Sequence, residues 1–207
     1  YTYPNNKLVY KKSNMILRAQ SDASYLSREN AGSVAGGILM LINNNDDNYD
    51  QNGAIQTISS RIDVVVSSAG EAEYAAVFTV AKLVEWLRTV LEALGYKQPA
   101  TKIICDNKCA VGLSNNQVKM KKSKAMDMRF HWVRDRIKQE HIEVIWQEGA
   151  NNLADFFTKA VPQKVHQERM KMLMKIPIQD NDHFINKRAN RANAFKRKIN
   201  DIKIKKE

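Results

Sequence analysis

The sequence predicts an α/β domain in which helices pack on the faces of a mixed β-sheet. Three apolar stretches of strand length come first, at Met15–Asp22, Ala35–Ile42 and Ala54–Ser60, and we expect them to form an antiparallel meander. A long helix follows from about Gly70 to Leu94, and shorter strands and helices alternate after it. This order of elements is typical of a layered α/β or α+β domain.

The second half of the chain adds two strands and three helices to this prediction. Gly95 ends the long helix, and the polar stretch Asn43–Asn52 is predicted to be a loop. Asn151 or Asn152 would cap a last helix that runs through Asp155 toward Met174. The other elements are expected at Lys102–Asp106 (strand), Cys109–Ser114 (short helix), Lys124–Gln139 (amphipathic helix) and His141–Gln147 (strand).

The composition fits one folded domain with extensions at both ends. The chain has 207 residues, of which 43% are hydrophobic and 27% are charged. No apolar run approaches the ~18 residues of a membrane-spanning helix, so no membrane partner is expected. We expect a connector over 1–14, a domain over 15–175 and a basic, flexible tail over 176–207. Because the chain begins at Tyr1 with neither an initiator Met nor a signal-peptide pattern, it is expected to be a fragment or a piece of a longer polypeptide.

Positive charge is concentrated in the C-terminal part and in one internal cluster. From Lys159 onward, 14 Lys and Arg stand against 5 Asp and Glu, a net charge of +9, whereas residues 1–158 carry only +2. Such a tail either attracts nucleic acid or is a solvated polypeptide end. The internal cluster over 119–136 has a net charge of +5 and is either a phosphate-binding surface or an exposed helix face. The candidates for nucleic-acid binding are Lys119, Lys121, Lys122, Lys124 and Arg129.

Carboxylates occur at element ends that a sheet would bring together. Asp22 ends the first predicted strand, Asp106 ends the fourth, and Asp155 lies in the first turn of the last helix. The start of the long helix offers both Glu71 and Glu73. The helical stripe through Glu73 is otherwise apolar, whereas the stripe through Glu71 includes Lys and Glu residues. Glu73 is therefore expected to face the sheet.

Carboxylates gathered in this way favour a divalent cation. Clustered carboxylates repel each other, which raises their pKa values unless a cation compensates the charge. Oxygen ligands without His or Cys select Mg²⁺ or Mn²⁺, and two such ions can promote phosphodiester cleavage. Cys105 and Cys109 have no His or second Cys pair nearby, which disfavours a zinc site and a disulfide and indicates a reducing compartment. Each carboxylate taken alone is better explained as a helix cap or an exposed charge, but this explanation weakens for all four in this order.

Several ordered segments resemble the ribonuclease H domain at the end of the Pol polyprotein of copia-type retrotransposons. They are Ser21–Ser27 (SDASYLS), Ser67–Tyr74 (SSAGEAEY), Ile104–Asn107 (ICDN), Lys124–Asp135 (KAMDMRFHWVRD) and Asn152–Lys159 (NLADFFTK). The similarity extends from about Asn14 to about Met174. The chain departs from the family at Lys124-Ala125-Met126-Asp127, where the family often has Lys-His-Ile-Asp, and it lacks the reverse transcriptase that normally lies upstream.

The resemblance implies the ribonuclease H fold, a sheet of three antiparallel and two parallel strands surrounded by helices. It implies two Mg²⁺ or Mn²⁺ ions and hydrolysis of the RNA strand of an RNA–DNA hybrid, which leaves 3′-hydroxyl and 5′-phosphate ends. The implied partners are the hybrid and an upstream reverse transcriptase domain, inside the cell in a cytoplasmic virus-like particle or in the nucleus. The catalytic and metal-binding residues would be Asp22, Glu73, Asp106 and Asp155, with Ser24, Asn107 and His131 as auxiliary candidates.

Two other functions stay open. A decayed transposon remnant would bind nucleic acid without cutting it, although a binding role needs no acidic cluster beside a polyanion. Another nuclease of the same fold, such as an integrase or a junction resolvase, would carry a different spacing of acidic segments. The segment Asn152–Lys159 favours ribonuclease H over these nucleases.

Overall fold

The computed structural model describes residues 6–43, 52–116 and 124–174, apart from the side chains of 124–127. Residues Leu8–Met174 form one compact unit, which contains all the helices and strands that follow. The expected tail at 176–207 and the first five residues of the expected connector lie outside the described residues. The same is true of Lys119, Lys121 and Lys122.

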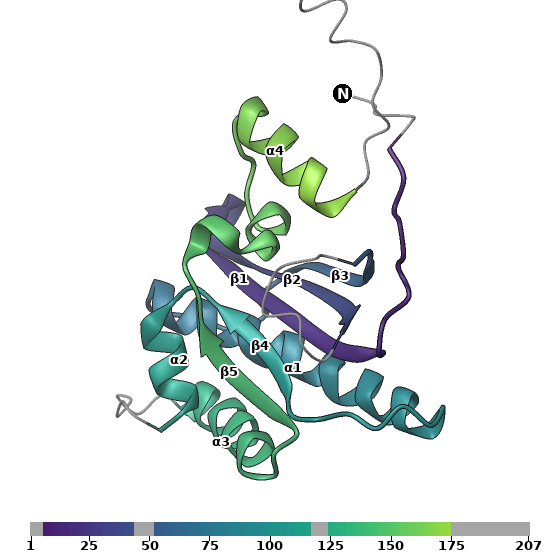
Figure 1. The fold of residues 1–207 in the computed structure, drawn as a ribbon. Coiled ribbons are helices and arrows are strands. Elements are labelled where there is room, and N and C mark those ends of the chain that lie inside the picture. The colour runs from purple at the N-terminus through teal and green to yellow at the C-terminus, as the bar shows by residue number, and fades with distance from the viewer. Residues whose placement is uncertain (1–5, 44–51, 117–123, 175–207) are drawn as a thin grey trace, which may run out of the picture. The chain divides into compact units, whose positions relative to one another are not determined.

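One mixed sheet has the strand order β3-β2-β1-β4-β5, which confirms the predicted architecture (Figure 1). The first three strands form an antiparallel meander. Its central strand β2 (Gly32–Ile42) pairs antiparallel with β1 (Ile16–Arg28) and with β3 (Ala54–Arg61). β4 (Thr101–Cys105) is parallel to β1, and β5 (Ile142–Trp146) is parallel to β4. The carboxyl ends of these three parallel strands therefore point toward the same edge of the sheet.

Three helices cover one face of the sheet. α1 (Ala69–Ala93) contacts β1, β2 and β4 through its buried apolar stripe. α2 (Lys108–Ser114) and α3 (Lys124–Lys138) pack beside α1 and against β5. Gly95 ends α1 as predicted, since its φ of +90° lies in the left-handed region that an L side chain disfavours. These elements surround the largest apolar core of the described residues.

The opposite face is covered by the short 3₁₀ helix η3 (Leu153–Phe157), which packs with α4 (Gln163–Leu173). Two adjacent glycines of β2 mark the two faces. A Cβ on Gly37 would lie 2.7 Å from Val80 of α1, whereas a Cβ on Gly36 would lie 2.7 Å from the carbonyl oxygen of Ala154 in η3. The absence of a side chain at Gly36 therefore lets η3 lie directly on the sheet.

The prediction of one continuous helix from Asn152 toward Met174 is wrong. The chain forms η3, then an irregular stretch, and then the separate helix α4. Pro162 explains the interruption, because proline has no N–H and its ring clashes with the carbonyl of the residue four positions earlier in a helix. Thr158 also ends η3, since its N–H donates to the carbonyl oxygen of Asp155 (3.3 Å).

β1 is longer than predicted, because it continues through Asp22 to Arg28. Its second half pairs with β2 alone, while its pairing with β4 stops at Ser21. Asp22 is therefore not the last residue of a strand, although it is the first residue beyond the parallel pairing. Pairing with β2 sustains this extension, which the mostly polar segment 24–30 did not reveal in the sequence.

Candidate active site

Two carboxylates come directly after the point where the pairing of the neighbouring strands β1 and β4 ends. The last parallel pair is Ser21 with Cys105, so Asp22 and Asp106 are the next residues on these neighbouring strands. Asp22 is almost fully buried, at 2% exposure. Asp106 is half-buried, and Gly149 approaches its carboxylate so closely that a Cβ there would lie 2.6 Å from Oδ2.

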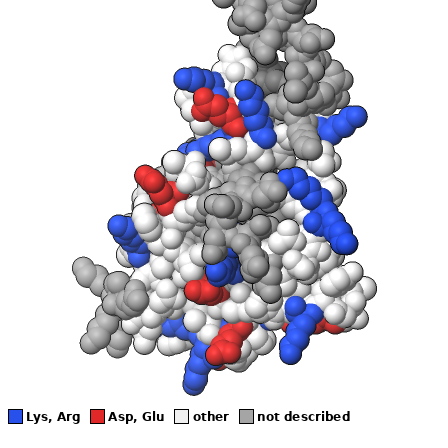
Figure 2. Space-filling model, in the orientation of Figure 1, with Lys and Arg blue, Asp and Glu red and all other residues white. Residues whose placement is uncertain are grey.

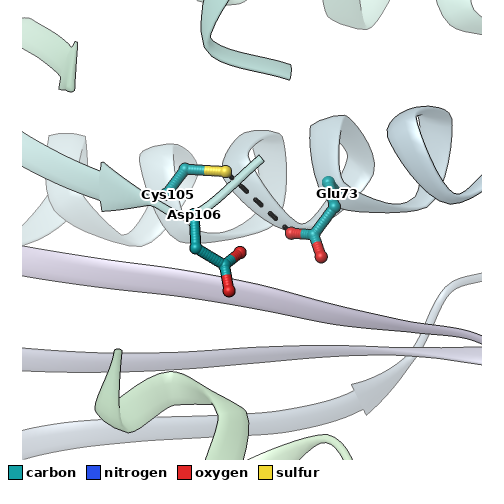
Figure 3. Close-up of side chains that lie close together, drawn as sticks. All are labelled: Glu73, Cys105 and Asp106. Carbon is teal, nitrogen blue, oxygen red and sulfur yellow. Dashed lines mark hydrogen bonds between the residues drawn. The ribbon is translucent and has the colours of Figure 1, made fainter. Parts of the chain in front are cut away.

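Glu73 brings a third carboxylate from the first turns of α1. Its side chain is buried, at 8% exposure, and Cys105 Sγ lies 3.9 Å from Glu73 Oε2 (Figure 3). One ligand atom from each of Glu73, Cys105 and Asp106 lies within 4.8 Å of the others. The prediction from helical periodicity that Glu73 faces the sheet is therefore confirmed.

The neighbouring Glu71 has a different role. Ser68 Oγ accepts a hydrogen bond from the Glu71 N–H (3.2 Å), and the Glu71 carboxylate accepts one from the Ser67 N–H (2.7 Å). This pattern fixes where α1 begins and is a variant of the capping box, because Glu71 accepts from the residue before the N-cap Ser68. The cap thus determines which residue of the helix, two positions later, points toward the sheet.

η3 holds the fourth carboxylate against the same region. Asn152 Nδ2 donates to the carbonyl oxygen of Ser21 (2.8 Å), and the N–H of Leu153 donates to Gln20 Oε1 (2.8 Å). The Thr158 hydroxyl donates to Asp22 Oδ2, which links the end of η3 to the first carboxylate. Asp155, between these anchors, is 6% exposed. The confirmed N-cap residue is Asn152, whose Oδ1 accepts from the Ala154 N–H (3.1 Å).

Two basic side chains from later in the sequence neutralise the Asp155 carboxylate. Lys159 Nζ pairs with Oδ1, and Arg169 of α4 pairs with Oδ2. The Arg169 side chain is 15% exposed, and the Lys159 side chain is 51% exposed. Asp155 is therefore compensated within the chain, whereas no ion pair is found for Asp22, Glu73 or Asp106 among the described residues.

Electrostatics distinguish the carboxylates further. Burial raises the pKa of Asp22 to about 6, with the charges of Asp155 and Asp106 adding to the shift and the Thr158 hydrogen bond opposing it. Burial raises the pKa of Glu73 to about 9, and the charges of Asp22 and Asp106 raise it further. Burial also raises the pKa of Asp106. The nearby Lys159 charge lowers each of these pKa values, but burial and the mutual repulsion of the carboxylates outweigh it.

The negative charge of these carboxylates stabilises the protonated form of Lys159. Burial opposes its charged form, but the hydrogen bond to Asp155 and the charges of Asp22, Asp155 and Asp106 raise the pKa of Lys159. Its ammonium group therefore stays protonated and belongs electrostatically to the carboxylate cluster.

The donor set fits a hard divalent cation. Burial and the nearby Glu73 charge raise the pKa of the Cys105 thiol far above neutral pH, so this sulfur stays protonated and is a poor metal ligand. Oxygen donors of Asp22, Glu73 and Asp106 remain, and oxygen-only sites suit Mg²⁺ or Mn²⁺. A cation there would remove the repulsion that raises the pKa values of these groups.

The auxiliary candidates from the sequence have varied surroundings. The buried Ser24 donates its hydroxyl to the carbonyl oxygen of Thr158 (2.9 Å), and Asn107 caps α2 by accepting from the Ala110 N–H (3.1 Å). His131 is exposed on α3. The Arg129 guanidinium stacks over the ring of Phe78, 5.0 Å from its centre.

Sequence reasoning missed several residues that organise the site. Thr158 and Lys159 lie inside the segment Asn152–Lys159, whose resemblance could have pointed to them. Gln20 faces η3 from β1, and its period-2 relation to Asp22 was the available signal. Arg169 offered no signal, since it is one of many basic residues after Lys159.

The fold is shared with solved ribonucleases H. A ribonuclease H1 isolated from compost by a metagenomic approach superimposes with a TM-score of 0.50, over 70% of this chain and 93% of that chain, at 12% sequence identity. The chain therefore has the ribonuclease H fold.

Sequence relatives are retrotransposon polyproteins. The chain is 36% identical over 110 residues to the retrovirus-related Pol polyprotein from transposon TNT 1-94 of Nicotiana tabacum, and this match covers 53% of the chain. It is 31% identical over 171 residues to the transposon Ty1-DR5 Gag-Pol polyprotein of Saccharomyces cerevisiae, which covers 79% of the chain. Each match spans 8% of the relative's own length, and no family model matches the chain. Together with the fold, these matches identify the chain as a ribonuclease H domain of the retrotransposon Pol polyprotein family.

Within the residues described, no helix has the length and apolar character needed to span a lipid bilayer.

Proposed function

We propose that this domain is a divalent-metal-dependent endonuclease that hydrolyses the RNA strand of an RNA–DNA hybrid. The observation that carries the proposal is the convergence of Asp22, Glu73 and Asp106 at the edge where β1 and β4 separate. The ribonuclease H fold and the homology to Pol polyproteins support it. A role in binding alone would not need buried, mutually repelling carboxylates next to a polyanion.

The chain's own residues would hold the cations and fix their surroundings. Asp22, Glu73 and Asp106 offer oxygen donors, and the Thr158 hydroxyl fixes the orientation of the Asp22 carboxylate. When bound, two divalent cations supply Lewis acidity that activates water and stabilises the leaving oxygen. The Cys105 thiol beside Glu73 is buried and protonated, so it is not suited to attack the phosphorus.

Recognition of the hybrid would depend on its shape and on the 2′-hydroxyl groups of the RNA strand. We further propose that the upstream reverse transcriptase of the same copia-type polyprotein delivers the hybrid, in a cytoplasmic virus-like particle or in the nucleus. Arg129 would assist through its half-buried guanidinium, and it is the one candidate for nucleic-acid binding whose side chain lies among the described residues.

Strand-specific cleavage tests this function. An RNA–DNA hybrid labelled on either strand is incubated with the chain in Mg²⁺ or Mn²⁺, with and without chelator, beside duplex DNA and duplex RNA. We expect cleavage of the RNA strand alone, and loss of it with chelator and in Asp106→Asn. The matched control is Asp135→Asn, which removes an exposed carboxylate that pairs with Arg136 on α3 and should leave cleavage intact.

The outcome also decides between the proposal and its alternative. Hybrid binding without cleavage in either metal would contradict the independent nuclease and favour a binding remnant. Cleavage that persists in Asp106→Asn would show that the activity arises elsewhere.

A further inference from the structure

A polar cleft lies between the β1–β2 hairpin and the end of β3. Its lining includes Arg28 and Glu29 from the hairpin, and Ser59, Ser60 and Arg61 from β3. Both arginine side chains are exposed. Among the described residues, neither guanidinium takes part in an ion pair. The lining of the cleft thus carries two positive charges, from Arg28 and Arg61, and one negative charge, from Glu29.

Strand register aligns this cleft with the carboxylates. Asp22 pairs with Gly36, and Gly36 pairs with Ser59, so a line across three strands joins the first carboxylate to the cleft. Because Ala154 and Thr158 cover Gly36 on this line, a bound strand would cross the outer surface of η3 and Thr158. Directly paired residues of neighbouring strands project to the same face. Since strands are about 4.8 Å apart, the Cα atoms of Asp22 and Ser59 are separated by about 10 Å.

A second line, one pleat further along the strands, leads to Arg61. Ser24 pairs with Val34, and Val34 pairs with Arg61, which places this arginine on the face that carries Asp22 and Ser59. The hydroxyls of Ser24 and Ser59 both donate to backbone carbonyls of η3 or the residue after it, which agrees with this common face. By the spacing of strands and residues, the Cα atoms of Arg61 and Asp22 are about 12 Å apart.

We propose that Arg28 and Arg61 bind phosphates of the nucleic acid strand that is cut at the carboxylates, a proposal that rests on the proposed function and adds a second contact to it. Guanidinium groups bind phosphate oxygens through two parallel hydrogen bonds. A separation of about 12 Å corresponds to three or four nucleotides at about 3.4 Å along a strand. The distance therefore favours a continuous nucleic acid backbone over a separate acidic protein partner.

Charge on the face drawn in Figure 2 does not offer an obvious alternative. On the face drawn in Figure 2, Lys and Arg side chains of the coloured residues are scattered among Asp and Glu and do not merge into one patch. A defined pair of arginines near the carboxylates is thus a more specific anchor than the general positive charge.

Equilibrium binding of the hybrid tests the cleft. The full chain carrying Asp106→Asn, which prevents cutting, is titrated with a fluorescent RNA–DNA hybrid at several salt concentrations in Ca²⁺. Arg28→Gln and Arg61→Gln should each weaken binding by about 3- to 10-fold and reduce the slope of log affinity against log salt by about 1. Glu29→Gln should tighten binding by about 2- to 3-fold, because a carboxylate beside the phosphates is removed.

Lys97→Gln is the matched control. It removes one exposed positive charge from the connection that precedes β4, at the end of this strand opposite to Asp106. This variant should change neither the affinity nor the salt slope. Circular dichroism of all variants checks that each is folded.

Affinities of Arg28→Gln and Arg61→Gln equal to that of Lys97→Gln would overturn the proposal. Failure of the proposed function has a different signature. If the wild-type chain binds the hybrid with this arginine dependence but does not cleave it, the cleft is supported and the nuclease is contradicted. If the wild-type chain cleaves the hybrid and both arginine variants bind it with unchanged affinity, the nuclease is supported and the cleft is contradicted.

Discussion

Replacing Glu73 by glutamine should stabilise the metal-free domain. Glu73 is buried, and its pKa is raised to about 9, so folding in the absence of metal requires this group to take up a proton or bear a buried charge. Glutamine keeps the size of the side chain and can still accept the hydrogen bond from the backbone of Ala23. It removes only the cost of the ionisable group.

The size of the effect follows from the two pKa values. An ordinary glutamate has a pKa of 4.5, so the unfolded chain binds fewer protons than the folded chain between pH 4.5 and about pH 9. The free energy of unfolding of the wild type therefore falls as the pH rises through this window. The value pH 7 lies about 2.5 units above the pKa of Glu73 in the unfolded chain. At 1.36 kcal/mol per unit, the ionisable group therefore lowers the free energy of unfolding at pH 7 by about 3 kcal/mol.

Thermal unfolding in chelator measures this prediction. About 3 kcal/mol should raise the Tm of Glu73→Gln by roughly 6–12 °C above that of the wild type at pH 7, and the gap should shrink toward zero near pH 4.5. Mg²⁺ or Mn²⁺ should stabilise the wild type more than the variant and narrow the gap at neutral pH. Glu71→Gln is the control, because it keeps an acceptor in the capping box and should change stability by less than about 1 kcal/mol.

Two results would refute the reasoning. One is a Glu73→Gln variant that is no more stable than the wild type at pH 7 in chelator. The other is a stability gap of the same size at pH 5 and pH 8, since a difference that does not depend on pH cannot come from the ionisation of Glu73.

Three further substitutions test the packing and charge around the site. Asn152→Ala should cost about 2 kcal/mol in chemical denaturation, because the variant loses both a cap and a buried hydrogen bond, whereas the exposed Asn151→Ala should cost less than about 0.5 kcal/mol. Gly36→Ala should destabilise by about 1–3 kcal/mol and lower hybrid cleavage, since its Cβ meets the backbone of η3; unchanged cleavage would contradict this. Arg169→Gln should tighten Mn²⁺ binding about fivefold in calorimetry, because it frees Oδ2 of Asp155 from an ion pair worth about 1 kcal/mol; weaker binding would mean that the arginine positions the carboxylate instead.

The sequence predicted the elements whose patterns are long and local. The apolar stripe of α1 distinguished Glu73 from Glu71, because a helix of 25 residues repeats its pattern many times. The strand ends at Asp22 and Asp106 were expected to meet in a sheet, whereas the two parallel strands were implied only by the family resemblance and the pairing of β1 with β4 was not predicted.

Other features depend on tertiary contacts that leave little mark in the sequence. β1 continues beyond Asp22 because β2 pairs with it, and η3 stays short because Thr158 and Pro162 end its hydrogen-bonding pattern. The pairing of Asp155 with Arg169 joins residues on two elements whose separation was not predicted. Such a contact can be recognised only when the packing of α4 is known.

Direct measurement of Mn²⁺ binding tests whether the carboxylates form one metal centre. The wild-type chain and Asp106→Asn are titrated with Mn²⁺, and the free ion is followed by electron paramagnetic resonance, with Asp135→Asn as the control for loss of an exposed carboxylate. We predict that the wild type and Asp135→Asn bind Mn²⁺ alike and that Asp106→Asn binds it at least about tenfold more weakly. Equal Mn²⁺ affinity in all three proteins would contradict the assignment of this edge of the sheet as the metal site.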